Sequence, residues 1–123
     1  MSSFFLNFKE EAAKFNGKLH SEFSRPFRLR GAWEVGVYAC NMAAEAGNVW
    51  VFSDIVDFSY VNEIPMRVMD VVDVTGNKNS KAMYSKVIRK NLSSINIEFK
   101  EHPSSETLVA NTDVTCILHF RKA

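Results

Sequence analysis

The sequence is poor in the residues from which small domains build cross-links, metal sites and catalytic centres. Its 123 residues include two cysteines and three histidines. Cys40 and Cys116 cannot form a disulfide framework, and no histidine lies at metal-ligand spacing from a cysteine or another histidine. The chain also lacks a glycine-rich phosphate loop and a serine nucleophile elbow. We therefore expect no enzyme, no catalytic residue, no cofactor and no bound metal.

Long apolar runs and one-sided charge are also missing. No stretch approaches the roughly 20 apolar residues that span a bilayer, and the N-terminus has no basic segment followed by an apolar core, as in a signal peptide. We expect no membrane span and synthesis in a reducing intracellular compartment. The net charge is +1, without the basic stripe of a nucleic-acid-binding protein. We expect no specific nucleic acid partner and interpret the basic residues between positions 78 and 90 as a solvated loop and strand face.

Hydrophobic residues in a period of two are abundant. They make up 46% of the chain, which is enough for one core in a chain of single-domain length. Successive strand residues point to opposite faces, so Trp33, Val35, Val37 and Ala39 are predicted to share one face, with Cys40 on the other. Strands are predicted at 15–19, 33–40, 49–56, 66–74, 83–88, 93–99, 108–110 and 113–120.

Seven or eight short strands separated by turns are typical of a two-layer β-sandwich. The count and the length fit a jelly roll, which has eight strands in two Greek keys. Pro26 cannot donate a ladder hydrogen bond, so its surroundings are predicted to be an edge strand or a turn. The sequence predicts an all-β fold, a single jelly-roll β-sandwich of seven to eight antiparallel strands over residues 15–123.

Residues 1–14 are predicted to form a short N-terminal arm or helix ahead of this domain. Phe4, Phe8, Ala12 and Phe15 recur at three- and four-residue spacing, as on one side of an amphipathic helix, and a serine could cap that helix. Three alternatives stay open: an amphipathic helix, a flexible arm that orders on a partner, and a helix that closes one end of the core.

Two groups of polar or reactive side chains allow both a functional and a structural interpretation. Cys40 and Cys116 could form a redox pair or supply a nucleophile, but Cys116 shares a face with apolar neighbours and is interpreted as a core residue. His119 falls on the opposite face of the last predicted strand from Leu118 and Phe120, and is interpreted as a structural histidine.

Acidic and aromatic residues give two further alternatives. The pairs Asp54/Asp57 and Asp70/Asp73 could cluster to bind Ca²⁺, and are interpreted as strand-end charges that prevent edge pairing. The pairs Trp33/Glu34 and Trp50/Tyr60 could form a sugar-binding platform, and are interpreted as part of the core because stacked aromatic residues in a sandwich mostly lie there.

Six segments occur in an order that resembles one protein family. The segment from Pro26 to Val37 reads PFRLRGAWEVGV and resembles an "L-x-G-x-W-E-V-x-L" signature. The other matches are Val49–Val56 to "V-Y-V-Y-C-D-I-V", Pro65–Met69 to "P-L-L-R-I-V", Tyr84–Val87 to "Y-x-x-V", Ser94–Phe99 to "I-x-I-x-I" and Val114–Arg121 to "V-T-L-H-F-R". In this order the chain is similar to the penton proteins, the single jelly-roll vertex proteins of Polinton/Maverick elements, adintoviruses and related virophage-like viruses.

The resemblance covers residues 15–121 and has three departures, one of which is a short loop around Gly76. Ser53 stands where the family has a cysteine, and Asn62-Glu63-Ile64 stands where a "V-G-D" loop is expected. The missing glycine leaves the shape of that loop open.

The resemblance implies assembly instead of catalysis. Penton proteins form homopentamers at the fivefold vertices of an icosahedral capsid, in contact with double jelly-roll major capsid proteins. The expected location is the virion, with assembly inside the host cell. Phe4, Phe5 and Phe8 are predicted to anchor the subunit against neighbouring capsid proteins, because three exposed phenylalanines would promote aggregation of a free monomer. The alternative is a monomeric β-sandwich that binds a carbohydrate or another ligand.

Overall fold

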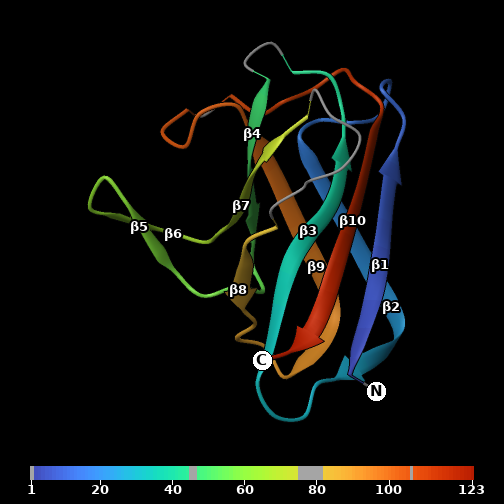
Figure 1. The fold of residues 1–123 in the computed structure, drawn as a ribbon. Helices are drawn as coiled ribbons and strands as arrows, with labels where there is room; N and C mark the ends of the chain where they lie inside the picture. Colours follow the sequence, from blue (N-terminus) through green and yellow to red (C-terminus); the bar gives the residue numbers. More distant parts are fainter. Residues whose placement is uncertain (1, 45–46, 75–81, 106) are drawn as a thin grey trace.

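The computed structural model describes residues 2–44, 47–74, 82–105 and 107–123. In this part of the chain two four-stranded antiparallel sheets pack against each other, and a two-stranded hairpin projects from them (Figure 1). The described residues contain no helix. The all-β sandwich that the sequence predicts is therefore confirmed.

The sandwich consists of two sheets, each named after its first strand. The β1 sheet has the order β1-β10-β3-β8 and the β2 sheet has the order β2-β9-β4-β7. The strands of the β1 sheet are β1 (Ser3–Glu10), β10 (Val114–Lys122), β3 (Trp33–Asn41) and β8 (Tyr84–Lys86). The strands of the β2 sheet are β2 (Lys18–Arg28), β9 (Asn91–Lys100), β4 (Asn48–Ser53) and β7 (Val68–Asp73).

The pairing of these strands is nested. β1 pairs with β10, β2 with β9, β3 with β8 and β4 with β7, and the members of each pair run antiparallel. The first half of the chain is thus laid against the second half, with successive pairs placed alternately in the two sheets. This is the arrangement of a jelly roll, and the predicted topology is confirmed.

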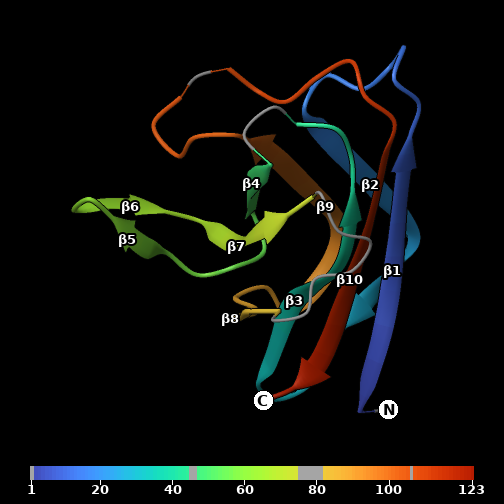
Figure 2. The same ribbon diagram turned by 45° about the horizontal axis from the view of Figure 1, so that its top comes forward.

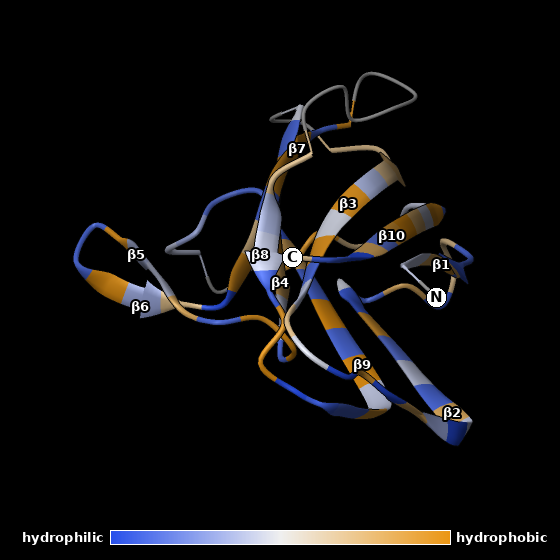
Figure 3. Cartoon of the chain, turned by 60° about the horizontal axis from the view of Figure 1, so that its bottom comes forward, coloured by the Kyte–Doolittle hydropathy of each residue, from blue (hydrophilic) through white to orange (hydrophobic). Residues whose placement is uncertain are grey.

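The core lies between the two sheets. Val35 and Val37 on β3, and Ile95 and Ile97 on β9, are fully buried. The alternation of Ile95 and Ile97 with polar residues appears in Figure 3 as hydrophobic and hydrophilic bands along β9. Each buried side chain of this size contributes about 1.5–3 kcal/mol relative to an exposed one, so the period-two pattern drives the packing of the two sheets.

A helix, one of the alternatives left open for the N-terminal arm, is excluded for Ser3–Glu10, because these residues form β1. This strand is paired with β10 along its whole length. The spacing of Phe4 and Phe8 fits a strand as well as a helix, since four residues is also a multiple of two. Leu6 between them completes an inward-facing set. β10 pairs with the whole strand, whereas an isolated helix of this length is only marginally stable in water.

A β-bulge changes the face to which the second half of β3 points. Leu118 lies opposite Val37 and Ile117 opposite Ala39, so the register shifts by one residue. Beyond the shift Cys40 is buried in the core. The predicted outward position of Cys40 is wrong, because the bulge depends on pairing with β10 and leaves no local signal.

β2 lies at the edge of its sheet, as Pro26 predicts. The register between β2 and β9 shifts between Glu22 and Phe27, around the proline that cannot donate to the ladder. The predicted strand at 108–110 is reduced to a single bridge between Lys100 and Leu108.

The projecting hairpin consists of β5 (Ser59–Val61) and β6 (Ile64–Met66) and is inserted between β4 and β7. The predicted strand at 66–74 is therefore divided, with its first residue ending β6. Asn62 and Glu63 have φ values of 50° and 68°, as in the type I′ turns that join short hairpins. Figure 2 shows the hairpin extending away from both sheets.

Candidate functional site

The three predicted interface residues have different environments in β1. Phe8 is 7% exposed and belongs to the core. Phe4 is partly buried and stacks on Phe120, with ring centroids 4.7 Å apart. Phe5 points to the opposite side and is 54% exposed. The expectation of three exposed phenylalanines is wrong for Phe4 and Phe8, and Phe5 alone is available to a partner.

Phe5 belongs to a group of rings on the outer face of the β1 sheet. Its ring stacks on the imidazole of His119, with centroids 4.5 Å apart. Tyr38 meets Phe5 edge-on at 5.2 Å and is 39% exposed. The three residues come from β1, β10 and β3, which are neighbours in the sheet, so the pairing of strands creates the group.

The group continues toward β8. The hydroxyl of Tyr84 lies 2.7 Å from Nδ1 of His119, at hydrogen-bond distance. The guanidinium of Arg121 lies 3.5 Å from the centroid of the Tyr84 ring, and its Nε donates to Oε1 of Glu34 at 2.6 Å. Ring stacking, a cation–π contact and an ion pair thus hold these side chains in place. Phe5, Tyr38, Tyr84, His119 and Arg121 are called the aromatic face below.

Gly36 makes room for this arrangement. It lies on β3 opposite Tyr84, and a Cβ there would be 2.8 Å from the carbonyl oxygen of Met83 and 3.2 Å from two ring atoms of Tyr84. Any other residue would push β8 or the tyrosine ring away. The close approach therefore depends on a missing side chain.

The β5–β6 hairpin presents a second exposed apolar surface. Tyr60 is 77% exposed, Ile64 54% and Phe58, just before β5, 53%. Arg67 lies below this surface, with its guanidinium 3.9 Å from the centroid of the Phe58 ring and its Nη1 donating to the carbonyl of Val56 at 2.6 Å. The base of the hairpin is thereby fixed to the sandwich.

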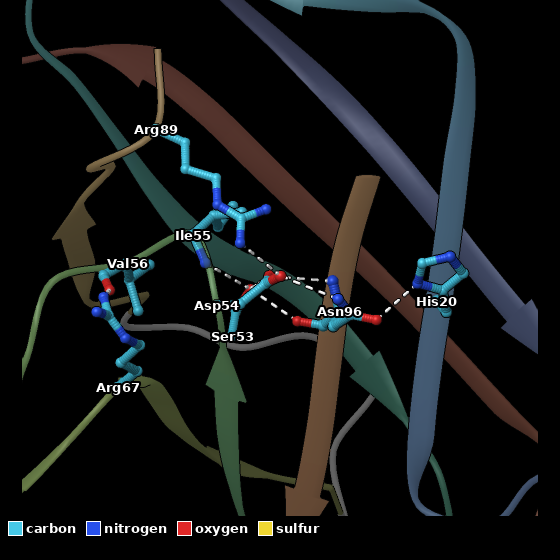
Figure 4. A network of polar contacts seen from close by, with 8 residues as sticks. All are labelled: His20, Ser53, Asp54, Ile55, Val56, Arg67, Arg89 and Asn96. Atoms are coloured by element: carbon cyan, nitrogen blue, oxygen red, sulfur yellow. Dashed lines mark hydrogen bonds and ion pairs between the residues drawn. The ribbon is translucent and has the colours of Figure 1, made fainter. Parts of the chain in front are cut away.

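A polar network occupies the outer face of the β2 sheet (Figure 4). Asp54, after β4, accepts hydrogen bonds from the backbone N–H and from Nδ2 of Asn96 on β9, at 3.1 and 2.9 Å. It also pairs with Arg89 at 3.2 Å, and the hydroxyl of Ser53 donates to the carbonyl of Asn96 at 2.9 Å. The network ties the ends of β4 and β8 to β9, and its groups bond mainly to each other.

His20 joins this network from β2. Its Nδ1 lies 2.6 Å from Oδ1 of Asn96, and its Nε2 lies 3.3 Å from Oε1 of Glu22. The pKa of His20 is raised above its ordinary value, first by the hydrogen bond with Asn96 and then by that with Glu22. Both ring nitrogens face acceptors, so the protonated form makes two hydrogen bonds and the neutral form one.

A shallow pocket of about 200 Å³ lies beside this network. It is lined by Phe52, Ser53, Asp54, Arg67, Asn96 and Glu98. The Phe52 ring supplies its apolar part, and the Nζ of Lys100 lies 5.3 Å from the centroid of that ring. An apolar ring beside amide and carboxylate groups could accommodate a small polar ligand.

The two cysteines meet in the core. Cys40 and Cys116 are opposite each other on β3 and β10, and both are buried as free thiols. The hydrogen bond with Cys40, followed by burial, raises the pKa of the Cys116 thiol well above its ordinary value. The thiolate required for nucleophilic or redox chemistry is therefore disfavoured, and the interpretation of Cys116 as a core residue is confirmed.

The remaining candidate residues are dispersed. Trp33 is buried, with its Nε1 donating to the carbonyl of Arg30, so it is part of the core as predicted. Trp50 is half-buried on β4, whereas Tyr60 lies on the hairpin, and no ring contact joins the two among the described residues. Asp70 is buried and accepts the backbone N–H groups of Val71 and Met83.

The acidic and basic residues singled out from the sequence have the following surroundings in the part of the chain that the structure describes. It contains no group of three or more His, Cys, Asp or Glu side chains that could hold a metal ion. Of the basic residues between 78 and 90, Arg89 pairs with Asp54 and Lys90 donates to the carbonyl of Gly31. Lys78 and Lys81 lie outside the described residues. Nor do the described residues form a helix with the length and apolar character to cross a bilayer.

Sequence reasoning missed the aromatic face and the exposed side of the hairpin. The alternation of the last strand already puts His119 on the outside, but only the order of strands places Phe5, Tyr38 and Tyr84 beside it. Comparisons with protein-family models, curated proteins and solved structures give no match for this chain.

Proposed function

We propose that this chain is a structural protein of a viral capsid, similar to the penton proteins. It forms a homopentamer at the fivefold vertices, contacts a double jelly-roll major capsid protein and is assembled into the virion inside the host cell. Six sequence segments in the order of the family's motifs support this proposal. The single jelly roll, which is the fold expected for that family, supports it as well.

The observation that carries the proposal is the set of large apolar side chains that the subunit leaves exposed after its core is complete. Phe5, Tyr60 and Ile64 each expose more than half of their surface. Clustered exposed apolar side chains on a small domain indicate a binding surface. Aromatic residues and arginine are also the residues that dominate binding energy at protein interfaces.

The exposed surface has two separate parts, the aromatic face and the hairpin. In a closed ring each subunit uses two different patches, one for each neighbour, whereas a two-fold dimer uses one self-complementary patch. Two separate patches therefore favour a ring over a two-fold dimer. The number of subunits, five, comes from the resemblance.

The mass of the protein in solution tests the proposal. We expect sedimentation velocity and light scattering of the recombinant chain to give the mass of a pentamer. Electron microscopy should show rings that co-assemble with the major capsid protein. A chain that stays monomeric at every concentration at which it is soluble, with and without that capsid protein, contradicts the proposal.

The shallow pocket on the β2 sheet favours a second candidate function, a monomeric module that binds a carbohydrate or another small ligand. Phe52 offers a ring against which a sugar can stack, and Asn96 and Glu98 offer polar groups beside it. A glycan screen tests this candidate. A monomer that binds a glycan, and loses binding in Phe52→Ala but not in Val71→Ala, supports the module and contradicts assembly.

A further inference from the structure

We propose that the β5–β6 hairpin of one copy of this chain docks on the aromatic face of a second copy. The inference rests on the proposed self-assembly and names the two surfaces that perform it. It predicts a head-to-tail contact, in which the donor and acceptor surfaces of one subunit serve different neighbours.

The hairpin is built as a rigid donor. Two three-residue strands are joined by a two-residue turn with both φ values positive, the geometry that matches the twist of a short hairpin. The apolar side chains Phe58, Tyr60 and Ile64 remain largely exposed on this small frame. Because the frame is already ordered, docking loses less conformational entropy than the ordering of a loose loop would.

The aromatic face is built as a rigid acceptor. Phe5 and Tyr38 supply exposed ring area, and the contacts of His119 with Phe5 and Tyr84 fix the rings beneath. Rings held in one arrangement before binding are the kind of anchor that dominates protein interfaces.

Charge also pairs the two surfaces. The hairpin segment 57–66 contains Asp57 and Glu63, and Arg67 follows directly with its guanidinium on the Phe58 ring, so residues 57–67 carry one net negative charge. On the β1 sheet Lys9 and Lys86 are exposed and fall on the same side of their strands as Phe5 and Tyr84. Acidic residues on one surface and basic residues on the other steer association and fix its register.

A contact between the hairpin and Phe5 joins two copies, because the two lie on opposite sides of one subunit. Phe5 lies on β1, at the opposite edge of its sheet from β8. Figures 1 and 2 show the hairpin projecting on the side of β7 and β8, away from β1. The hairpin therefore projects away from Phe5 of its own subunit.

Complementary variants test the docking. Tyr60→Ser with Ile64→Ser removes the donor, and Phe5→Ser with Tyr38→Ser removes the acceptor. All four side chains are exposed, so each double variant is expected to fold. We expect each to be monomeric where the original chain assembles, with a dissociation constant raised at least about 100-fold. Val71→Ser, which removes a side chain of 36% exposure on the outer face of the other sheet, serves as the matched control and assembles normally.

Mixing the two double variants gives the decisive result. One retains an intact acceptor and the other an intact donor, so a one-to-one mixture is expected to form a heterodimer and nothing larger. Glu63→Lys should weaken assembly of the otherwise unchanged chain, and Lys86→Glu on the neighbouring copy should restore part of the loss.

The outcomes separate this inference from the proposed function. If the original chain assembles and both double variants assemble equally well, the docking is wrong and self-assembly stands. If the variant without the donor, Tyr60→Ser with Ile64→Ser, still self-assembles but fails to bind the major capsid protein, the hairpin binds another chain and the docking is again wrong. If the original chain is a monomer under all conditions, the proposed self-assembly fails as well.

Discussion

The outer faces of the two sheets follow the same alternation of side chains but differ in what those side chains contact. On the β2 sheet they bond to each other, as Asp54 does with Asn96 and Asn96 with His20. On the β1 sheet they are rings that stack and still leave Phe5 and Tyr38 exposed. A period of two thus predicts the face on which a side chain lies. The residues of the neighbouring strands determine whether that side chain has contacts within the subunit or stays exposed.

The largest change in stability is expected from substitution of the inward-facing phenylalanine of β1, compared with the outward-facing one. Phe8→Ala removes a core ring and should lower the free energy of unfolding by about 3–5 kcal/mol, whereas Phe5→Ala should lower it by at most about 1.5 kcal/mol, the upper worth of an exposed ring pair. Urea denaturation of the two variants measures the difference. Equal small effects would mean that β1 is a detachable arm, and deletion of residues 1–13 would then leave a stable domain.

A substitution at Gly36 should disrupt the packing of the aromatic face. Gly36→Ala places a methyl group against the Met83 carbonyl and the Tyr84 ring, so we expect a loss of about 1–3 kcal/mol from overpacking. The hydrogen bond between Tyr84 and His119 should be lost at the same time. Denaturation and the ring resonances of His119 in NMR report both effects, and unchanged resonances would show that β8 tolerates the added atom.

The corresponding test on the β2 sheet is Asp54→Ala. This variant leaves the backbone N–H and side-chain amide of Asn96 without their acceptor, and we expect a loss of about 1–3 kcal/mol. Asp54→Asn keeps an acceptor but removes the charge opposite Arg89, so it should lie between the original chain and Asp54→Ala. The same loss in both variants would mean that the ion pair with Arg89, and not the hydrogen bonds with Asn96, stabilises this network.

The smallest expected effect is a pH dependence at His20. Because the pKa of His20 is raised in the folded chain, its stabilising contribution is complete below the ordinary value of 6.5 and is lost as the pH rises through the folded pKa. Stability should therefore fall slightly between about pH 6 and about pH 8. Denaturation midpoints of the original chain and His20→Gln measure the difference, and a parallel dependence in both would exclude His20 as its source.

The sequence predicts the sandwich because alternation in Trp33–Val37 or Ile95–Phe99 can be read within one segment. It does not predict β1, since the spacing of Phe4 and Phe8 fits a helix and a strand equally. The position of Cys40 depends on a bulge against β10, and the turn at Asn62 and Glu63 adopts positive φ values without a glycine. The aromatic face depends on contacts between segments far apart in the chain, which a local pattern cannot reveal.

The nested pairing also fixes an order of events during synthesis. β1 finds its partner only when β10 exists, and next to this pair the N–H of Ala12 donates to Asp113, 101 residues further on. Closure over such a distance is slow, and until then the apolar side of the first strand has to be shielded by other means. Because Phe5 and His119 come together in that last step, an incomplete chain lacks the stacked rings of the aromatic face. Under the proposed docking, folding of the subunit therefore precedes its association.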